Sequence, residues 1–125
     1  MAAIDHLILP VNDMAASVAF WVDVLGFRCE GERPPFTVVR VSDDFVLQLA
    51  PWGTEGHVHL AFALDRPDFD AVFARVKARG VPYGESFHAV GTSTGPGVED
   101  GARGAAPTLY FTDPNKHLIE IRTYA

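Results

Sequence analysis

A repeated order of elements along the 125-residue chain is the feature that most constrains its fold. A β-branched and Leu-rich run over residues 4–9 ends at Pro10 and is typical of a strand. A helix is expected next, capped by Asn12 or Asp13 and stopped by Gly26. One face of this helix is apolar and carries Met14, Val18, Trp21, Val22 and Leu25. Short strands are then predicted at 27–31, 36–41 and 45–50.

The second half of the chain repeats this order. A strand is predicted at 57–64, and a helix with Pro67 in its first turn follows it and stops at Gly80. The apolar residues of this helix are Phe69, Val72, Phe73 and Val76, and the later strands are predicted at 81–83, 108–112 and 117–123. Each βαβββ unit alone leaves an apolar sheet face half covered, so the two units should pair. The sequence therefore predicts an α+β fold in one domain, 1–125, with modules at about 1–53 and 54–125.

Charge and composition restrict the partners. Ten Lys and Arg residues against sixteen Asp and Glu residues give a net charge of −6, which argues against a nucleic-acid partner. The longest nearly apolar run, 14–22, is shorter than the ~20 residues that cross a bilayer. Cys29 is the only cysteine, and no secretion signal precedes Ile4. We expect a cytoplasmic protein whose partner is a small molecule or another protein.

One segment interrupts the repeat. Residues 84–106 contain six glycines and show no strong periodicity. Structureless loops longer than about 12–15 residues are usually functional or disordered. We expect this segment to be a loop that covers a site or a flexible insertion.

Polar side chains lie near the middle of four predicted strands. Because side chains alternate faces along a strand, His6 lies with Ile4 and Ile8, and Gln48 lies with Val46 and Ala50. By the same alternation, His59 shares a face with His57, Ala61 and Ala63, and Glu120 shares one with Leu118 and Arg122. A buried glutamate without a partner costs several kcal/mol, so Glu120 needs either Arg122 or a bound metal.

Two imidazoles and one carboxylate are a ligand set for Zn²⁺, Ni²⁺, Mn²⁺ or Fe²⁺ that leaves positions open for substrate and water. Taken singly, each residue also suits a structural role. His6 can be an ordinary histidine at a strand end, His59 a core histidine and Glu120 one half of an ion pair. The sequence contains no HExxH, CxxC, GxSxG or P-loop motif that would indicate a competing chemistry.

The chain resembles the vicinal oxygen chelate superfamily, which includes glyoxalase I, fosfomycin-inactivating thiol transferases, extradiol dioxygenases and bleomycin-binding proteins. The resemblance covers nearly the whole chain and rests on the order and spacing of short motifs at 4–7, 20–21, 25–27, 59–62, 109–115 and 118–121. It implies two βαβββ modules that form a curved eight-stranded sheet around a metal cleft, and it implies a homodimer.

The resemblance also assigns roles to individual residues. The metal ligands of the first, fifth and last strands of the family match His6, His59 and Glu120, for one divalent ion. The fourth-strand position matches Gln48, a further candidate ligand, where glyoxalase I-like proteins of bacteria carry a glutamate. Thiol transferases and dioxygenases use only the set of two histidines and one carboxylate.

Four candidate functions follow from these expectations. The favoured one is a glyoxalase-like metalloenzyme, similar to lactoylglutathione lyase, whose small substrate chelates the ion through adjacent oxygens. Glu120 or a metal-bound water is its candidate proton carrier, and a glutathione adduct is one candidate substrate. The alternatives are a fosfomycin-type thiol transferase, an extradiol dioxygenase, and a metal-free protein that binds an antibiotic or aromatic ligand. The candidate substrate-binding residues are His57, Trp52, Phe36, Phe87 and Tyr110, and the aromatic residues among them can equally belong to the core.

Overall fold

The chain forms two compact units, Met1–Glu55 and Gly56–Ala125. The computed structural model describes residues 1–124, and these form nine strands, two α-helices and one π-helical turn. The predicted α+β class is confirmed, with the strands in two separate sheets. None of the helices within residues 1–124 is long and apolar enough to span a membrane.

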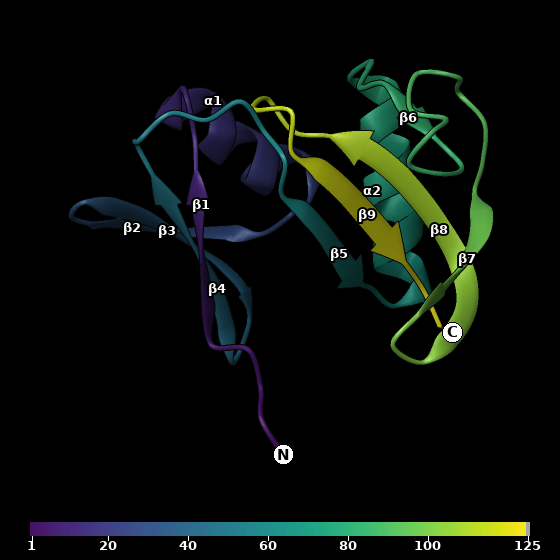
Figure 1. Cartoon of the computed structure of the whole chain (residues 1–125), viewed down its shortest axis with the longest axis horizontal. Helices are drawn as coiled ribbons and strands as arrows, with labels where there is room; N and C mark the ends of the chain where they lie inside the picture. The colour runs from purple at the N-terminus through teal and green to yellow at the C-terminus, as the bar shows by residue number, and fades with distance from the viewer. Residues whose placement is uncertain (125) are drawn as a thin grey trace. The chain divides into compact units, whose positions relative to one another are not determined.

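The first unit has the predicted βαβββ order. Its elements are β1 (His6–Pro10), α1 (Met14–Ala19), the π-helical turn η1 (Phe20–Val24), β2 (Arg28–Arg33), β3 (Phe36–Ser42) and β4 (Phe45–Ala50). The strand order in the sheet is β1-β4-β3-β2, and β1 runs parallel to β4 while the other neighbours are antiparallel (Figure 1). The first strand of the unit therefore pairs with the last.

The second unit repeats this connection. Its elements are β5 (His59–Ala63), α2 (Arg66–Ala78), β6 (Tyr83–Gly84), β7 (Gly97–Gly101), β8 (Gly104–Thr112) and β9 (Leu118–Arg122). Here β5 runs parallel to β9, as β1 does to β4. In Figure 1, α2 lies behind the sheet of β5, β9 and β8, and its Phe69, Val72 and Val76 are buried.

Strand β7 is the main departure from the predicted order. The long strand β8 pairs with β7 along its first half and with β6 near its end, so two short segments cover one edge. The segment 84–106 was predicted to lack regular structure, but its second half is a β-hairpin. The sequence of β7, GVEDG, is poor in β-formers, and its strand conformation comes from pairing with β8.

The first helix also departs from the prediction. Asp13 caps α1 by accepting a hydrogen bond from the Ala16 amide at 3.1 Å. The helix then widens into η1, where the Leu25 amide donates to the Phe20 carbonyl at 3.3 Å, a bond across five residues. This extra residue per turn rotates the apolar face. Phe20 and Val24 are buried together with Trp21 and Leu25 of the predicted face, whereas Val18 and Val22 of that face are only half-buried.

Candidate functional site

The parallel pair of β5 and β9 brings two predicted ligands together. Ala61 lies opposite Glu120, and the His59 side chain on the same face reaches across to that carboxylate. His59 Nε2 lies 3.1 Å from Glu120 Oε1. The Glu120 side chain is 5% exposed and that of His59 is 48% exposed, so the carboxylate is buried beneath an accessible imidazole. The opposite face of β9 carries Ile119 and Ile121, which are fully buried in the core.

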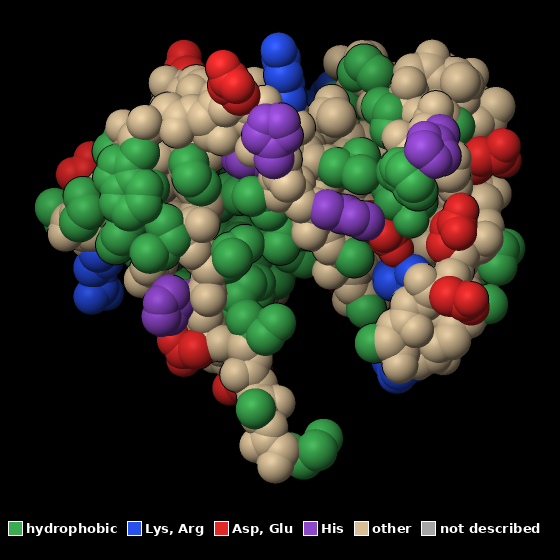
Figure 2. Space-filling view, viewed as in Figure 1, with side chains coloured by type: hydrophobic (Ala, Val, Ile, Leu, Met, Phe, Trp, Pro, Cys, Tyr) green, Lys and Arg blue, Asp and Glu red, His purple; other side chains and the backbone are tan. Residues whose placement is uncertain are grey.

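The second carboxylate oxygen of Glu120 is held by an arginine. Arg122 Nη1 donates to Glu120 Oε2 at 2.7 Å, and both side chains are 5% exposed. The Tyr110 hydroxyl also donates to Glu120; burial first, and then this bond to a carboxylate, raise the pKa of Tyr110 well above its usual range. Of the two cations considered for Glu120, Arg122 is therefore in direct contact with it. Figure 2 shows histidine, acidic and basic side chains side by side over this sheet.

The β7–β8 hairpin binds the two terminal nitrogens of the guanidinium. Arg122 Nη2 donates to the carbonyls of Glu99 at 2.9 Å and Gly104 at 3.0 Å, and Nη1 also donates to the Asp100 carbonyl at 3.4 Å. Burial acts to lower the pKa of Arg122, but hydrogen bonds with Glu120 and Tyr124 raise it overall. The buried pair is therefore ionic.

The His59 and Glu120 atoms fit a divalent ion. Two ligands bound at about 2.0–2.2 Å to one ion lie roughly 3.0–3.5 Å apart, and Nε2 and Oε1 are 3.1 Å apart. A carboxylate only accepts hydrogen bonds, so Nε2 carries the hydrogen here, and a metal would replace it. No third His, Cys, Asp or Glu among residues 56–124 joins this pair to form a ligand cluster.

The first unit carries the other predicted ligands on one face of its sheet. His6 lies opposite Val46, and Gln48 lies two pairs further along, opposite Ile8. Asp5 Oδ2 accepts a hydrogen bond from His6 Nδ1 at 2.7 Å. This bond fixes the tautomer and leaves the lone pair of Nε2 for a metal, as in many histidine ligands. The His6 side chain is 47% exposed.

The predicted substrate-binding residues lie in different places. In the first unit Phe36 contacts Trp52 edge to face, with ring centroids 5.8 Å apart, and Trp52 is 60% exposed. Tyr110 is buried beside His59, with ring centroids 5.9 Å apart. Phe87 is exposed and contacts His88. Among these residues, the structure places Phe36 next to Trp52. It places Tyr110 next to the candidate ligands His59 and Glu120.

The predicted placement of His57 on the His59 face is wrong. Strand β5 begins at His59, and His57 precedes it with a φ of 87°. This left-handed conformation breaks the alternation of side chains, so strand geometry does not align His57 with His59. The local sequence contains no signal for this conformation.

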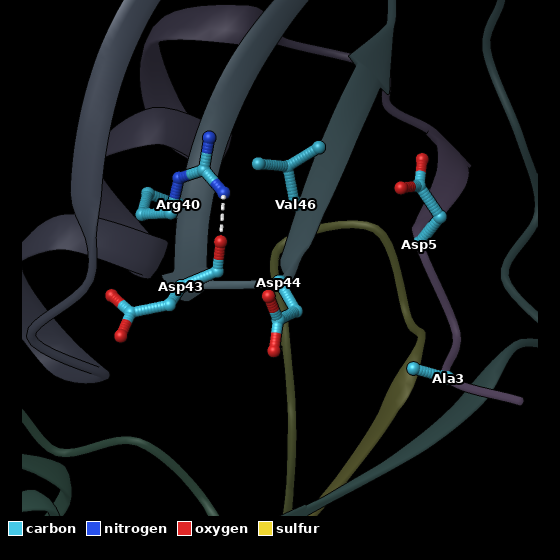
Figure 3. Close-up of a pocket in the computed structure, with 6 residues that line it drawn as sticks. All are labelled: Ala3, Asp5, Arg40, Asp43, Asp44 and Val46. Atoms are coloured by element: carbon cyan, nitrogen blue, oxygen red, sulfur yellow. Dashed lines mark hydrogen bonds between the residues drawn. The ribbon is translucent and has the colours of Figure 1, made fainter. Parts of the chain in front are cut away.

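A separate pocket of the first unit lies at the end of its sheet. It has a volume of about 610 Å³ and is lined by Ala3, Asp5, Arg40, Asp43, Asp44 and Val46 (Figure 3). Arg40 donates to the Asp43 carbonyl at 3.2 Å, the bond drawn in the figure. Asp5 is the residue that this pocket shares with the surroundings of His6.

Two site features are missed by reasoning from sequence. Tyr110 is buried, as the core alternative predicts, but its contact with Glu120, opposite it on β9, is not predicted. Alternation along a strand puts Asp5 on the face opposite His6, but Asp5 precedes β1 and contacts the imidazole. Predicting the contact between Tyr110 and Glu120 requires the register of β8 with β9. Predicting the contact between Asp5 and His6 requires the exact start of β1.

Comparison with known families and structures gives the same fold. The profile of the Glyoxalase/Bleomycin resistance protein/Dioxygenase superfamily matches residues 3–121. The chain belongs to this superfamily. The glutathione transferase FosA of Serratia marcescens is 24% identical over 128 residues, which cover 97% of this chain and 80% of that protein. The virulence protein STM3117 of Salmonella typhimurium is 28% identical over 130 residues, which cover 97% of this chain and 83% of that protein.

A solved structure agrees over the full length. Oxidase ChaP-H1 superimposes with a TM-score of 0.81 at 26% identity and covers 100% of this chain and 98% of that chain. The family is therefore established over residues 3–121, and the fold is that of this superfamily.

Proposed function

We propose that this superfamily member is a divalent-metal-dependent, glyoxalase-like enzyme. Its substrate would be a small molecule, such as a glutathione adduct, that chelates the ion through adjacent oxygens. His6, His59 and Glu120 are the proposed ligands, with Gln48 as a further candidate. His6 belongs to the first unit, and His59 and Glu120 belong to the second.

The contact between His59 Nε2 and Glu120 Oε1 carries this proposal. It joins an accessible imidazole to a buried carboxylate at the spacing of two ligands of one ion. The bond from His6 Nδ1 to Asp5 supports it, because it presents Nε2 of His6 as a donor. Zn²⁺, Ni²⁺, Mn²⁺ and Fe²⁺ all suit two imidazoles and a carboxylate.

The roles of the chain's own residues follow from their chemistry. When bound, the metal supplies Lewis-acid stabilisation of an enolate or alkoxide oxygen. Glu120 is the proposed proton carrier, whereas the amide of Gln48 cannot take a proton near neutral pH. Tyr110 and Arg122 keep the carboxylate in one orientation. Trp52 and Phe36 are proposed to contact the substrate, as are Phe87 and His57.

A thiol transfer to an epoxide is the second candidate function. It is supported by the relative named as a glutathione transferase, which is 24% identical over 97% of this chain. Gln48 also favours it over lactoylglutathione lyase activity, because thiol transferases of the family resemble this chain in having no glutamate ligand there. Both candidates use the same three ligands.

Metal binding tests the proposal directly. One divalent ion per chain is expected by elemental analysis of protein purified without added metal and by titration with Mn²⁺. His59→Ala and Glu120→Ala should abolish stoichiometric binding. His57→Ala is the matched control, since it removes a neighbouring histidine that lies outside the strand, and it should leave binding largely intact. Equal loss from all three variants would contradict the choice of His59.

A substrate screen then separates the two candidates. The metal-loaded chain is assayed with the glutathione hemithioacetal of methylglyoxal, with fosfomycin and glutathione, and with catechols. Isomerisation of the hemithioacetal supports the first function, and a glutathione–fosfomycin adduct supports the second. The proposed homodimer is measured by light scattering. A monomer at micromolar concentration with full metal binding would show that a single chain completes the site.

A further inference from the structure

We propose that Arg122 is an internal counter-ion of Glu120, a positioning residue that keeps the carboxylate ordered without metal and weakens the binding of divalent cations. This inference rests on the proposed function of Glu120 as a ligand. It concerns the order of the Glu120 carboxylate when no ion is bound and the affinity of the chain for a divalent cation.

The contacts of Glu120 divide its two oxygens. Oε2 accepts from Arg122 Nη1 at 2.7 Å, and Oε1 faces His59 Nε2 at 3.1 Å. Arg122 therefore binds Oε2 of Glu120 and leaves Oε1 facing the accessible imidazole of His59. A buried carboxylate would otherwise need a metal to compensate its charge, and the site would depend on the ion to fold. With Arg122 in place, the ligand pair is already formed in the free chain.

The backbone fixes the guanidinium in this position. Three carbonyls of the β7–β8 hairpin accept from it, those of Glu99, Asp100 and Gly104. The ring of Tyr124 lies 5.0 Å from the Arg122 Cζ. A Cβ on Gly101 would lie 2.6 Å from both Arg122 Nη2 and Tyr124 Oη, so any side chain there would displace the guanidinium. The glycine-rich hairpin therefore acts on Glu120 through Arg122.

The sign of the effect on metal binding follows from the charges. A positive guanidinium next to Oε2 repels a divalent ion next to Oε1, and burial reduces the screening of this repulsion by water. Removing the charge should tighten metal binding. Loss of a purely structural residue would disorder the ligands and weaken binding instead. The two explanations therefore predict opposite changes.

The experiment titrates Mn²⁺ alone into the metal-free full chain at one fixed pH above neutrality. Arg122→Gln removes the charge and keeps a polar side chain, and it should bind Mn²⁺ at least about tenfold more tightly than the parent. Arg122→Lys retains the charge and should stay within about threefold of the parent. Unchanged or weaker binding by Arg122→Gln would overturn the inference.

The chain offers a matched control in Arg40. This arginine also holds a glutamate with two bonds, to Glu30 Oε1 and Oε2 at 3.1 Å, and it donates to the carbonyls of Ser42 and Asp43. Arg40→Gln removes the same charge from a partly exposed pair and should leave the Mn²⁺ affinity within about threefold of the parent. An equal tightening in both variants would show a general effect of net charge and overturn the specific role of Arg122.

Other outcomes separate this inference from the proposed function. If the parent binds Mn²⁺ and Arg122→Gln binds it equally, the proposed function stands and the inference fails. If only Arg122→Gln binds, the inference is supported and the parent is not a Mn²⁺ protein. If neither binds, both fail. Should Arg122→Gln not fold, Gly101→Ala displaces the guanidinium without removing it, and unchanged affinity in that variant overturns the inference.

Discussion

The two units carry matching positions on their first and last strands, but with different charges. In the first unit Gln48 lies on β4 opposite Ile8, and Ile8 follows His6 by two residues on β1. In the second unit Glu120 lies on β9 opposite Ala61, and Ala61 follows His59 by two residues on β5. The histidines correspond, whereas an amide in one unit replaces a carboxylate in the other.

The residues two positions after Gln48 and Glu120, on the same faces, also differ in charge. Two residues beyond Gln48 is Ala50, which is fully buried, and two residues beyond Glu120 is Arg122. A neutral amide needs no counter-ion, but a buried carboxylate does. In the second unit an arginine accompanies the charge at this position, and in the first unit the position and its neighbour are both neutral. The asymmetry makes the second unit the one with an anionic candidate ligand.

The largest expected effect comes from making the second unit resemble the first. Glu120→Gln leaves the buried Arg122 without its carboxylate and should lower the free energy of unfolding by about 3–5 kcal/mol, measured by urea denaturation. Stoichiometric metal binding should also be lost. Glu30→Gln is the control, because it removes an arginine-bound carboxylate that is partly exposed, and its effect should be much smaller. Equal effects would contradict the importance of burial.

A double substitution sharpens the same comparison. Glu120→Gln combined with Arg122→Met removes both charges, as in the first unit where neither exists. The double variant should be more stable than the sum of the two single losses predicts, by about 1–3 kcal/mol, because no unpaired charge remains. Urea denaturation of all four proteins in the cycle measures this coupling. Strict additivity would show that the two side chains stabilise the fold independently.

The converse exchange should act on metal affinity. Gln48→Glu adds a carboxylate to the first unit without an arginine beside it, and should tighten binding of a divalent ion by about tenfold. Hemithioacetal isomerase activity that the parent lacks or shows weakly should rise with it. Titration with Mn²⁺ and the isomerase assay measure both effects, with Gln48→Ala as the control. Efficient isomerisation by the parent would show instead that Gln48 is an adequate fourth ligand.

The smallest effect concerns the more exposed ion pair. Hydrogen bonds from Arg40 first, and then from Arg28, lower the pKa of Glu30. A lowered pKa means that Glu30 stabilises the fold at pH values above its unfolded pKa of about 4.3, and that this stability is lost as the pH falls through the folded value. Glu30→Gln should therefore be slightly less stable than the parent near neutral pH, with the difference vanishing in acid. High salt should reduce the difference. Thermal unfolding across this pH range measures it, and a difference that grows in acid would contradict the sign.

Much of the fold follows from local patterns. The strand and helix periods and the stops at Gly26 and Gly80 predicted both units and their order. Alternation along β5 and β9 also placed His59 and Glu120 on faces that the structure shows to be shared. These signals are local, because the direction of a side chain along a strand repeats every two residues.

Other features arise only from contacts distant in sequence. Strand β7 forms because β8 offers an edge to a segment poor in β-formers, and the rotated face of the first helix comes from a π-helical turn. The left-handed conformation of His57 removes it from a face that alternation had assigned to it.

The sequence by itself thus determined the class of fold, the two-fold repeat and the residue types of the candidate ligands, because hydrophobic periodicity and spacing are properties of neighbouring residues. Only the tertiary structure decided how Glu120 is compensated. The backbone carbonyls that hold Arg122 come from a hairpin 18 to 23 residues away. Every residue type carries the same carbonyl group, so its position depends on the folded path of the chain and leaves no mark in the sequence.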